Sequence, residues 1–445
     1  MNAPICDFVR DYAARQALRL HMPGHKGRGP LGVEALDITE IPGADSLYEA
    51  SGVIRESEEN ASHLFGCPTL YSTEGSSLCI RAMLYLTLLH AKAQGRKPRI
   101  VAGRNAHKTF LSAAALLDLD VVWLNPAPGD SYLSCTVSAD ALDMVLDGMD
   151  APAAVYLTSP DYLGNTVDVT ALAEVCRRRD VMLLVDNAHG AYLRFLPASR
   201  HPIDLGADIC CDSAHKTLPV LTGSAYLHLS PAAPQLCFDQ ARTALALFGS
   251  TSPSYLILQS LDAANLTLGD NYRESLARFI AEVDALKARL QAKGWLLQGD
   301  EPLKLTLRAK HRGYTGAELA QALEQENIVC EFADPDFLVL MLTPEVGSDG
   351  LAKLEAALDA LPKRTAIDAA PPAFHPAARA LSIRDAALSP CETLPVERCL
   401  GRILAAATVG CPPAVPILVC GERIDAHTLA CLRYYGIESC TVVRA

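Results

Sequence analysis

Six short runs of almost wholly apolar residues recur between about residues 60 and 265, and they alternate with segments of helical periodicity. Runs without polar alternation are typical of strands that are buried on both faces of a sheet. Strands that alternate with helices favour parallel pairing, with ligands bound at the carboxyl ends of the strands. We therefore predict an α/β fold around a mainly parallel sheet, with strands at 99–104, 121–126, 153–160, 181–188, 207–212 and 225–229.

The remainder of the chain has a different pattern. A long amphipathic helix is expected at 270–294, followed by a strand, a helix and a further strand, which is the pattern of a small α+β module. A Pro- and Ala-rich stretch at 369–380 is typical of a linker. The predicted organisation is an N-terminal segment at 1–60, a large domain at 61–265, a small α+β domain at 266–368 and a C-terminal domain at 381–445.

Charge and hydropathy narrow the class of protein. The 39 Lys and Arg residues are outnumbered by 51 Asp and Glu, which gives a formal net charge of −12. A mildly acidic chain without a basic block does not favour binding to nucleic acid or to a membrane surface. Asp7 and Arg10 interrupt the region where a signal peptide needs an apolar core, so a cytoplasmic protein is expected.

Two sequence features could suggest a metal site. Fifteen cysteines are present, but the six nearest the C-terminus form no C-x-x-C pair, so we expect reduced core thiols. His21 and His25 have the spacing of a metal pair on a helix, but Pro23 and Gly24 between them disfavour a helix. We therefore predict no metal, and a loop that shapes an active-site entrance at residues 21–29.

Polar residues at strand ends are the candidates for chemistry. Asp186 ends an apolar strand, where a carboxylate either caps the following helix or accepts a hydrogen bond from a cationic ring nitrogen. Gly75, Ser76 and Ser77 precede a helical run, where they either cap the helix or cradle a phosphate. His107 follows another strand and is either a solvated loop residue or a group that stacks on a planar ring.

Lys216 lies between two apolar segments, at 207–212 and 225–229, with no charged partner nearby in the sequence. Most lysines lie on the surface, but a desolvated lysine with a lowered pKa is what a Schiff base requires. Ser213 and Thr217 beside it could bind phosphate. A phosphate cradle, a stacking histidine, a strand-end Asp and a strand-end Lys follow one another in the order of fold-type-I pyridoxal-phosphate (PLP) enzymes.

The chain resembles a known family, the Orn/Lys/Arg decarboxylases of the prokaryotic type. The resemblance spans nearly the whole chain and rests on the motifs HMPGHKGRG (21–29), DITEIPGADSLYEASGVIRESEENASHLFG (37–66), RNAHKT, SPDYLGNTVD, VDNAHGA, SAHKTLPVLTG, FGSTSPSYLILQSLD (248–262), SPCETLPVERCLGRILA and CPPAVPILVCGERI. Glu74 departs from the pattern, since Asn is common there. The chain resembles a short form without the N-terminal wing domain of the large members.

The resemblance implies a fold-type-I enzyme whose large domain binds PLP, with a homodimeric or larger assembly. Lys216 is expected to form the Schiff base, Asp186 to keep the pyridine nitrogen protonated and His107 to stack on the ring. His215 is the expected proton donor after carbon dioxide leaves, and Lys216 contends for that role. The other expected cofactor contacts are Gly75, Ser76, Ser77, Ala188, His189 and Ser213, together with Thr251 and Ser252, which are expected to reach the cofactor of a partner subunit.

The expected substrate is arginine, lysine or ornithine, and the sequence does not choose among them. Glu331, Asp334 and Asp161 are candidates to bind the distal cation, although the residue type alone favours an ordinary surface carboxylate for each. An aminotransferase or an aldolase of the same fold stays open as an alternative, with Arg308 and Arg312 as possible carboxylate clamps. A non-catalytic member of the family is disfavoured because Lys216, Asp186 and His107 are all present.

Overall fold

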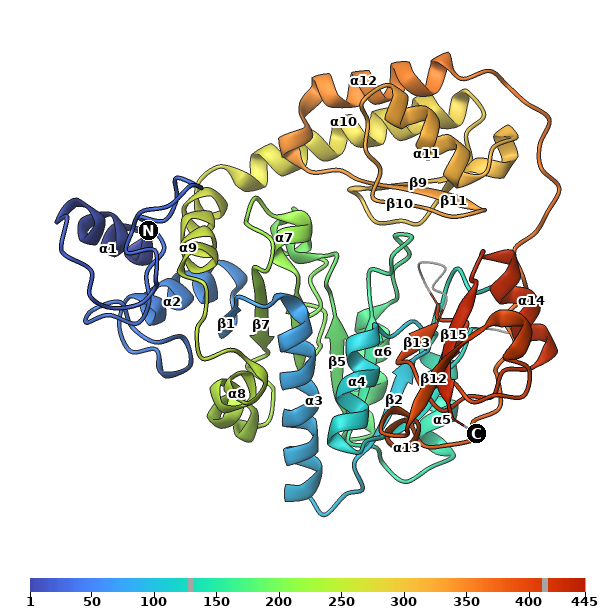
Figure 1. Ribbon diagram of the computed structural model, residues 1–445, viewed down its shortest axis with the longest axis horizontal. Helices are drawn as coiled ribbons and strands as arrows, with labels where there is room; N and C mark the ends of the chain where they lie inside the picture. Colours follow the sequence, from blue (N-terminus) through green and yellow to red (C-terminus); the bar gives the residue numbers. More distant parts are fainter. Residues whose placement is uncertain (127–130, 410–414, 445) are drawn as a thin grey trace. The chain divides into compact units, whose positions relative to one another are not determined.

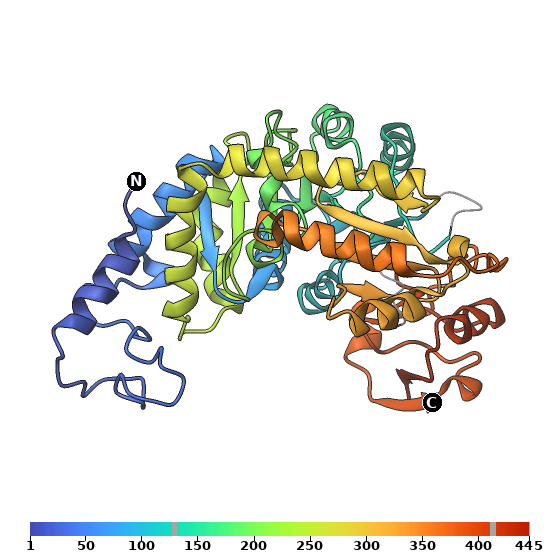
Figure 2. The ribbon, with the colours of Figure 1, turned by 90° about the horizontal axis from the view of Figure 1, so that it is seen from above.

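The computed structural model describes residues 1–126, 131–409 and 415–444 (Figures 1 and 2). Its internal contacts divide the chain into two compact units. Each unit combines two separate stretches of sequence: the first unit contains 1–95 and 182–275, and the second contains 96–181 and 276–445. The predicted domain boundaries stay a prediction, and the C-terminal motif at 411–424 is described only from Val415 onward.

Four strands of the first unit lie in the order β1-β7-β6-β5, with bounds Thr69–Ser72, Ala225–Leu229, Ile209–Asp212 and Met182–Asp186. β5 and β6 are parallel, as predicted, and their register pairs Asp186 with Cys211. β7 runs antiparallel to β6, and β1 runs antiparallel to β7. The antiparallel β7 departs from the predicted parallel pairing, because the connection from β6 to β7 contains only a four-residue helix and makes no full crossover.

Three parallel strands of the second unit lie in the order β4-β2-β3, with bounds Ala154–Thr158, Arg99–Gly103 and Asp120–Leu124. Helices α4 (Lys108–Leu117) and α5 (Ala139–Asp147) connect consecutive strands, and α6 (Val169–Arg178) follows β4. All six predicted strands are present, with ends within two residues of the expected positions. β1 was missed because four buried residues are too few to show a period.

An antiparallel sheet of order β10-β11-β9-β8 completes the α+β part of the second unit, with bounds Phe332–Ala333, Phe337–Met341, Lys304–Arg308 and Leu297–Gln298. Its helices are α10 (Tyr272–Ala292), α11 (Gly316–Gln325) and α12 (Gly347–Ala360). Figures 1 and 2 show α12 beside α10, and the Arg289–Glu355 ion pair at 2.8 Å joins these two helices.

The C-terminal stretch forms two small antiparallel sheets and two helices. β12 (Cys391–Pro395) pairs with β15 (Ser439–Val443), and β13 (Thr408–Val409) pairs with β14 (Leu418–Val419). The helices are α13 (Ile383–Ala387) and α14 (Ala426–Tyr434). All cysteines of the described residues are free thiols, as predicted, and Cys411 lies outside the described residues.

Helix α3 (Gly75–Ala93) positions the first unit's candidate site. Its residues are apolar on nearly every side, and it packs against β7 and α8 (Gln235–Phe248). A helix that is buried all round is fixed by the core, so its first turn is held in place. The other helices of this unit are α1 (Pro4–Ala14), α2 (Val53–Phe65), α7 (Ala214–Thr217) and α9 (Tyr255–Gly269). No helix in the described parts of the chain is long and apolar enough to cross a bilayer.

A buried ion pair anchors the C-terminal stretch within the second unit. Arg104, which follows β2, and Glu422, which follows β14, are both nearly inaccessible, and their side chains lie 2.8 Å apart. The same Glu422 oxygen accepts a hydrogen bond from the Val419 N–H at 2.9 Å. Burial raises the pKa of Glu422, and Arg104 opposes this rise. Loss of either partner therefore leaves an uncompensated buried charge.

We predict that Glu422→Ala lowers the free energy of unfolding of the second unit by about 3–5 kcal/mol, because the Arg104 charge stays buried without a partner. Urea unfolding combined with hydrogen exchange of the β2 and β14 peptides measures this loss. The matched control is Glu59→Ala, which removes the exposed Arg55–Glu59 pair and should cost at most about 1 kcal/mol. Equal effects of the two substitutions would contradict the assignment.

Candidate functional site

Lys216 and His189 meet at the carboxyl edge of the parallel pair β5–β6. Lys216 lies in α7, directly after β6, and His189 lies in the turn after β5. The Lys216 Nζ is 3.1 Å from the His189 Nε2. His189 is buried, whereas Lys216 is partly accessible. The two residues that the sequence placed after consecutive strands are therefore in direct contact.

The first turn of α3 lies against the segment that follows β6. The Ser213 hydroxyl donates a hydrogen bond to the Ser76 Oγ at 2.7 Å, and both residues are buried. The Gly75 N–H donates to the Gly223 carbonyl at 2.7 Å. Two of the residues predicted to bind phosphate, Ser76 and Ser213, are therefore joined, and Gly75 and Ser77 flank Ser76 in the same helical turn. The first turn of a helix presents backbone N–H groups that favour an anion.

Two glycines allow this close approach. Gly75 has φ +68°, and a Cβ there would lie 3.9 Å from the His215 Cε1. Gly223 has φ +98°, and a Cβ there would lie 2.9 Å from both the Thr73 carbonyl oxygen and the Ile257 Cδ1. A side chain at Gly223 would therefore push apart the two loops that hold the site.

The tautomer of His215 follows from its partner. The His215 Nδ1 is 2.9 Å from the Ser224 carbonyl oxygen, which also accepts the backbone N–H of His215 at 3.3 Å. A carbonyl oxygen only accepts, so Nδ1 carries the hydrogen. The Nε2 atom is then the one that can exchange a proton.

Asp186 ends β5 as a buried carboxylate. Its Oδ1 accepts a hydrogen bond from the Ala188 N–H at 3.2 Å and lies 3.7 Å from the Cys211 thiol. Burial raises the pKa of Cys211 well above its usual range, so this neighbour is a neutral thiol. The helix-capping alternative is wrong in detail, since the next helix is a 3-10 turn at Ala191–Phe195 whose N-cap is Gly190. The carboxylate instead closes a tight turn.

His107 lies in the second unit, at the start of α4. Its ring is exposed, and its Nδ1 accepts a hydrogen bond from the Thr109 N–H at 3.3 Å. His107 therefore caps this helix, which the sequence did not indicate because His is an uncommon N-cap. Stacking of its ring on a cofactor stays a prediction.

The three predicted substrate carboxylates, all in the second unit, have local partners. Asp161 is buried, and its Oδ1 accepts from the N–H groups of Leu163 and Asn165, both at 2.9 Å. Asp334 is buried and its Oδ1 accepts two N–H groups of its own turn, each at 2.7 Å. Glu331 is exposed and accepts the Tyr162 hydroxyl at 2.6 Å. A role in substrate binding stays a prediction for all three.

Arg312 and the two histidines of the motif at 21–29 also have defined partners. Arg312 donates to the Lys293 carbonyl at 3.0 Å and stacks over Trp295 at 4.8 Å, whereas Arg308 is exposed. His21 is 2.5 Å from the Tyr12 hydroxyl, and His25 is 3.1 Å from Asp37. The entrance role of residues 21–29 stays a prediction.

Thr251 and Ser252 are exposed, and the segment before them is anchored within the first unit. The Ser250 N–H donates to the Glu74 carboxylate at 2.5 Å. Glu74 is the residue that departs from the family's phosphate loop, and here it links that loop to the exposed segment. The sequence marked Glu74 as unusual but gave no partner for it.

The residues of the first unit fit a phosphorylated aldehyde such as PLP. A lysine amine, a pair of buried hydroxyls at a helix start and a buried carboxylate match the aldehyde, the phosphate and the ring nitrogen of that cofactor. In addition, the Thr217 Oγ1 beside Lys216 is buried and has no hydrogen-bond partner among the described residues. Such a hydroxyl is suited to a ligand oxygen.

Comparison with known proteins gives a family match over most of the chain. Residues 3–306 match the model described as Orn/Lys/Arg decarboxylase, major domain, and residues 368–439 match Orn/Lys/Arg decarboxylase, C-terminal domain. An arginine decarboxylase of Halalkalibacterium halodurans is 29% identical, with 97% of this chain and 93% of the relative covered. An arginine decarboxylase of Bacillus subtilis is 26% identical, with 96% and 92% covered.

Solved structures share the fold. The Francisella novicida lysine decarboxylase superposes with a TM-score of 0.77 at 16% identity, covering 100% of this chain and 81% of that chain. The Sphingomonas wittichii serine palmitoyltransferase gives a TM-score of 0.56 at 14% identity, covering 79% and 82%. The predicted fold-type-I α/β class is therefore confirmed, and so is PLP as the cofactor.

We predict that Gly223→Ala weakens PLP binding about tenfold or more, because the added Cβ displaces the Thr73 carbonyl and strains a positive φ. Titration of the apoenzyme with PLP, followed by absorbance, measures the affinity. Gly401→Ala is the control, since Gly401 also has a positive φ, +78°, but has no atom within 4 Å of the added Cβ. Unchanged PLP affinity in Gly223→Ala would show that the two loops do not form the site.

We predict that Asp334→Asn stabilises the protein at pH 8 and removes part of its pH dependence. Burial raises the pKa of Asp334 to about 6, so the folded state binds the proton more tightly than the unfolded chain. Stability from this group therefore falls as pH rises from about 4 to 6, by about 1–3 kcal/mol. Thermal unfolding at pH 5 and pH 8 measures the effect. The exposed Asp368→Asn is the control, and an equal shift in both variants would contradict the prediction.

Proposed function

This chain belongs to the Orn/Lys/Arg decarboxylase family and is a PLP-dependent amino acid decarboxylase, and we propose that its substrate is L-arginine. The family acts on basic amino acids, and the named relatives that align over nearly the whole chain, at 26–29% identity, are arginine decarboxylases. The single observation that carries the activity is the contact of Lys216 with His189 beside the hydroxyl pair of Ser76 and Ser213.

Lys216 is proposed to bind the cofactor aldehyde. PLP, when bound, supplies an electron sink for the electrons of the breaking Cα–carboxylate bond. The His189 Nε2, 3.1 Å from the Lys216 Nζ, fixes the position of the lysine side chain. The free amine is the nucleophilic form of lysine.

Asp186 and His215 are proposed to hold and to move protons. The buried Asp186 carboxylate keeps a ring nitrogen protonated, and the Ala188 N–H fixes its orientation. The Ser224 carbonyl holds the His215 Nδ1–H. The opposite nitrogen, Nε2, once it has taken up a proton from solvent, is then the atom that donates this proton to the substrate Cα after carbon dioxide leaves, and Lys216 is the second candidate for this step.

Phosphate binding is assigned to the first turn of α3 and to Ser213. The Ser76 and Ser213 hydroxyls lie within hydrogen-bond distance of each other, so one bound anion can contact both. Ser77 and the backbone N–H groups of the same turn add donors.

We infer that the active unit is a homodimer in which Thr251 and Ser252 reach the partner's cofactor. Both residues are exposed, and Glu74 holds the segment before them. The hydrogen bond from Ser250 to Glu74 fixes the position of the segment just before Thr251. Residues that contribute to the active site of a partner subunit need such a fixed position. A fully active monomer in light scattering would contradict this inference.

Recognition of the substrate's distal cation needs a carboxylate that a ligand can approach. Of the three candidates, Glu331 is exposed and is oriented by the Tyr162 hydroxyl, whereas Asp161 and Asp334 are buried. We therefore assign the distal guanidinium to Glu331. A bidentate contact of guanidinium with carboxylate favours arginine over lysine or ornithine.

We predict that the purified enzyme releases carbon dioxide and agmatine from L-arginine at least about tenfold faster than carbon dioxide and amine from L-lysine or L-ornithine. Parallel incubations analysed by mass spectrometry measure the products. Lys216→Ala should abolish turnover, and borohydride reduction with peptide mapping should label Lys216 in the native enzyme. Preference for lysine or ornithine would overturn the substrate, and a keto acid without carbon dioxide would favour an aminotransferase.

A further inference from the structure

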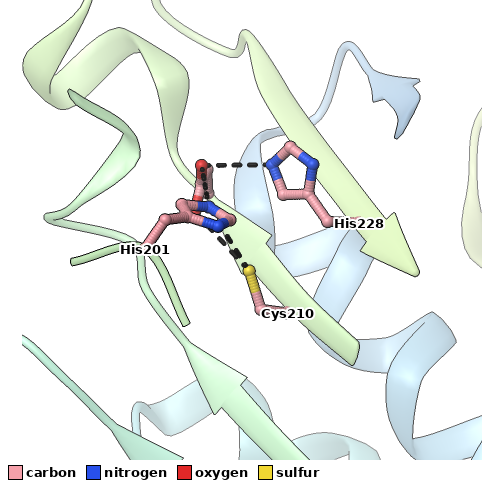
Figure 3. Close-up of side chains that lie close together, drawn as sticks. His201, Cys210 and His228 are labelled. Carbon is pink, nitrogen blue, oxygen red and sulfur yellow. Dashed lines mark hydrogen bonds and ion pairs between the residues drawn. The ribbon is translucent and has the colours of Figure 1, made fainter. Parts of the chain in front are cut away.

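Four fully buried side chains of the first unit form a polar cluster that the proposed function does not use: His201, Cys210, Asp212 and His228. Figure 3 labels His201, Cys210 and His228 of this cluster. Cys210 and Asp212 lie two residues apart on β6, and so on one face of it. His228 lies on β7, directly opposite Cys210 in the register. This unit's core therefore encloses a carboxylate between two imidazoles.

The cluster is held by hydrogen bonds to one carboxylate oxygen. The Nε2 atoms of His201 and His228 lie 3.2 Å and 3.1 Å from the Asp212 Oδ2. Burial opposes ionisation of Asp212, but the two histidines lower the pKa of its carboxyl below its usual range. Burial lowers the pKa of His228, so its ring is neutral and donates from Nε2. Its Nδ1 lies 3.0 Å from the Thr69 hydroxyl.

Hydrogen bonding accounts for this geometry better than a metal ion does. The Cys210 Sγ lies 3.7 Å from the His201 Nε2 and 3.9 Å from the Asp212 Oδ1, which are distances of weak hydrogen bonds from a thiol. The His201 Nδ1 is buried and has no partner among the described residues. A metal on Nε2 would move the proton to Nδ1 and leave a buried donor unpaired, whereas a proton on Nε2 leaves only an unused acceptor.

The second oxygen of Asp212 connects the cluster to the cofactor site. The Asn187 amide donates from Nδ2 to the Asp212 Oδ1 at 2.6 Å. Asn187 is fully buried and stands between Asp186 and Ala188 in the turn that ends at His189 and Gly190. The buried Asp212 carboxylate is thus hydrogen-bonded to the residue in the middle of that turn.

Asn187 is fixed on its other sides too. Its N–H donates to the Cys211 carbonyl at 3.0 Å, and its carbonyl accepts the Gly190 N–H at 2.8 Å. A Cβ on Gly190 would lie 2.1 Å from the Asn187 Oδ1, so only glycine permits this packing. Three bonds therefore set the path of the turn that carries Asp186 and His189.

We propose that Asp212 is a positioning residue for the cofactor site: held by His201 and His228, it fixes Asn187 and thereby the placement of Asp186 and His189. The inference rests on the proposed function for the roles of Asp186 and His189. The carboxylate acts through Asn187, and displacement of a catalytic group by about 1 Å is enough to lower turnover by about a hundredfold.

A double-mutant cycle on Asn187 and Asp212 tests the proposal, with three readouts: PLP affinity of the apoenzyme, visible circular dichroism of bound PLP, and kcat separately from KM. We expect Asn187→Ala and Asp212→Ala each to weaken PLP binding and to lower kcat about tenfold or more, and to alter the dichroism. We expect the double variant to be no worse than either single variant, since both act on one contact.

Two further variants distinguish a positioning role of Asp212 from a general loss of folding stability. Asp262→Ala removes another fully buried carboxylate of the same unit, which accepts from the Ser57 hydroxyl at 2.6 Å and from the Cys6 N–H at 2.9 Å. It should destabilise the fold but leave the dichroism and kcat unchanged. Asp212→Asn keeps an oxygen acceptor for Asn187, so it should restore most of the signal that Asp212→Ala loses.

Additive effects in the cycle, or the same dichroism and kcat in Asp212→Ala as in Asp262→Ala, would overturn the proposal. Stoichiometric zinc in the purified holoenzyme would overturn it as well, by making the cluster a metal site. If Asp212→Ala does not fold, Asn187→Ala alone tests the proposal, because this variant leaves the hydrogen bonds of His201 and His228 to Asp212 in place. PLP affinity and dichroism are measured without substrate. They therefore test the positioning role of Asp212 even if the enzyme proves inactive on L-arginine.

Discussion

The parallel pairing of β5 with β6 is the constraint on which the site depends. Because parallel strands end at the same edge of a sheet, the register that pairs Asp186 with Cys211 brings the turn 186–190 beside the segment that begins at Ser213. Lys216 can then reach His189, and Ser213 can reach Ser76. A slip of this register by one residue would turn every side chain of one strand to the other face and separate these groups.

This arrangement buries carboxylates, which lose solvation free energy, and hydrogen bonds to these carboxylates offset the loss. Asp186 and Asp212 end neighbouring strands, and each accepts hydrogen bonds from groups that are fixed by the backbone or by the core. An unpaired buried carboxylate would lose several kcal/mol of solvation. The second unit uses the same principle, where Arg104 compensates Glu422. Asp212 in the first unit and Glu422 in the second each join segments that are distant in the sequence.

Glycine gives the site its close contacts. Gly223 and Gly190 stand where a Cβ would collide with the Thr73 carbonyl and with the Asn187 side chain. Gly190 lies in the turn after β5, and Gly223 lies in the turn before β7. The core elements fix the strand ends, and these glycines let the turns pack closely enough for hydrogen bonds between them.

The sequence by itself determined the strands β2 to β7 and the family, because continuous apolar runs and the order of motifs are local or linear signals. The same motifs predicted the roles of Lys216, Asp186 and the serines. Only the tertiary structure decided that β7 and β1 are antiparallel and that His107 caps α4. The hydrogen bonds from Ser250 to Glu74 and from Asn187 to Asp212 were likewise decided only there. Each of these depends on a contact set by sheet register or loop packing, and the spacing of residues along a chain does not specify the partner of a buried polar group.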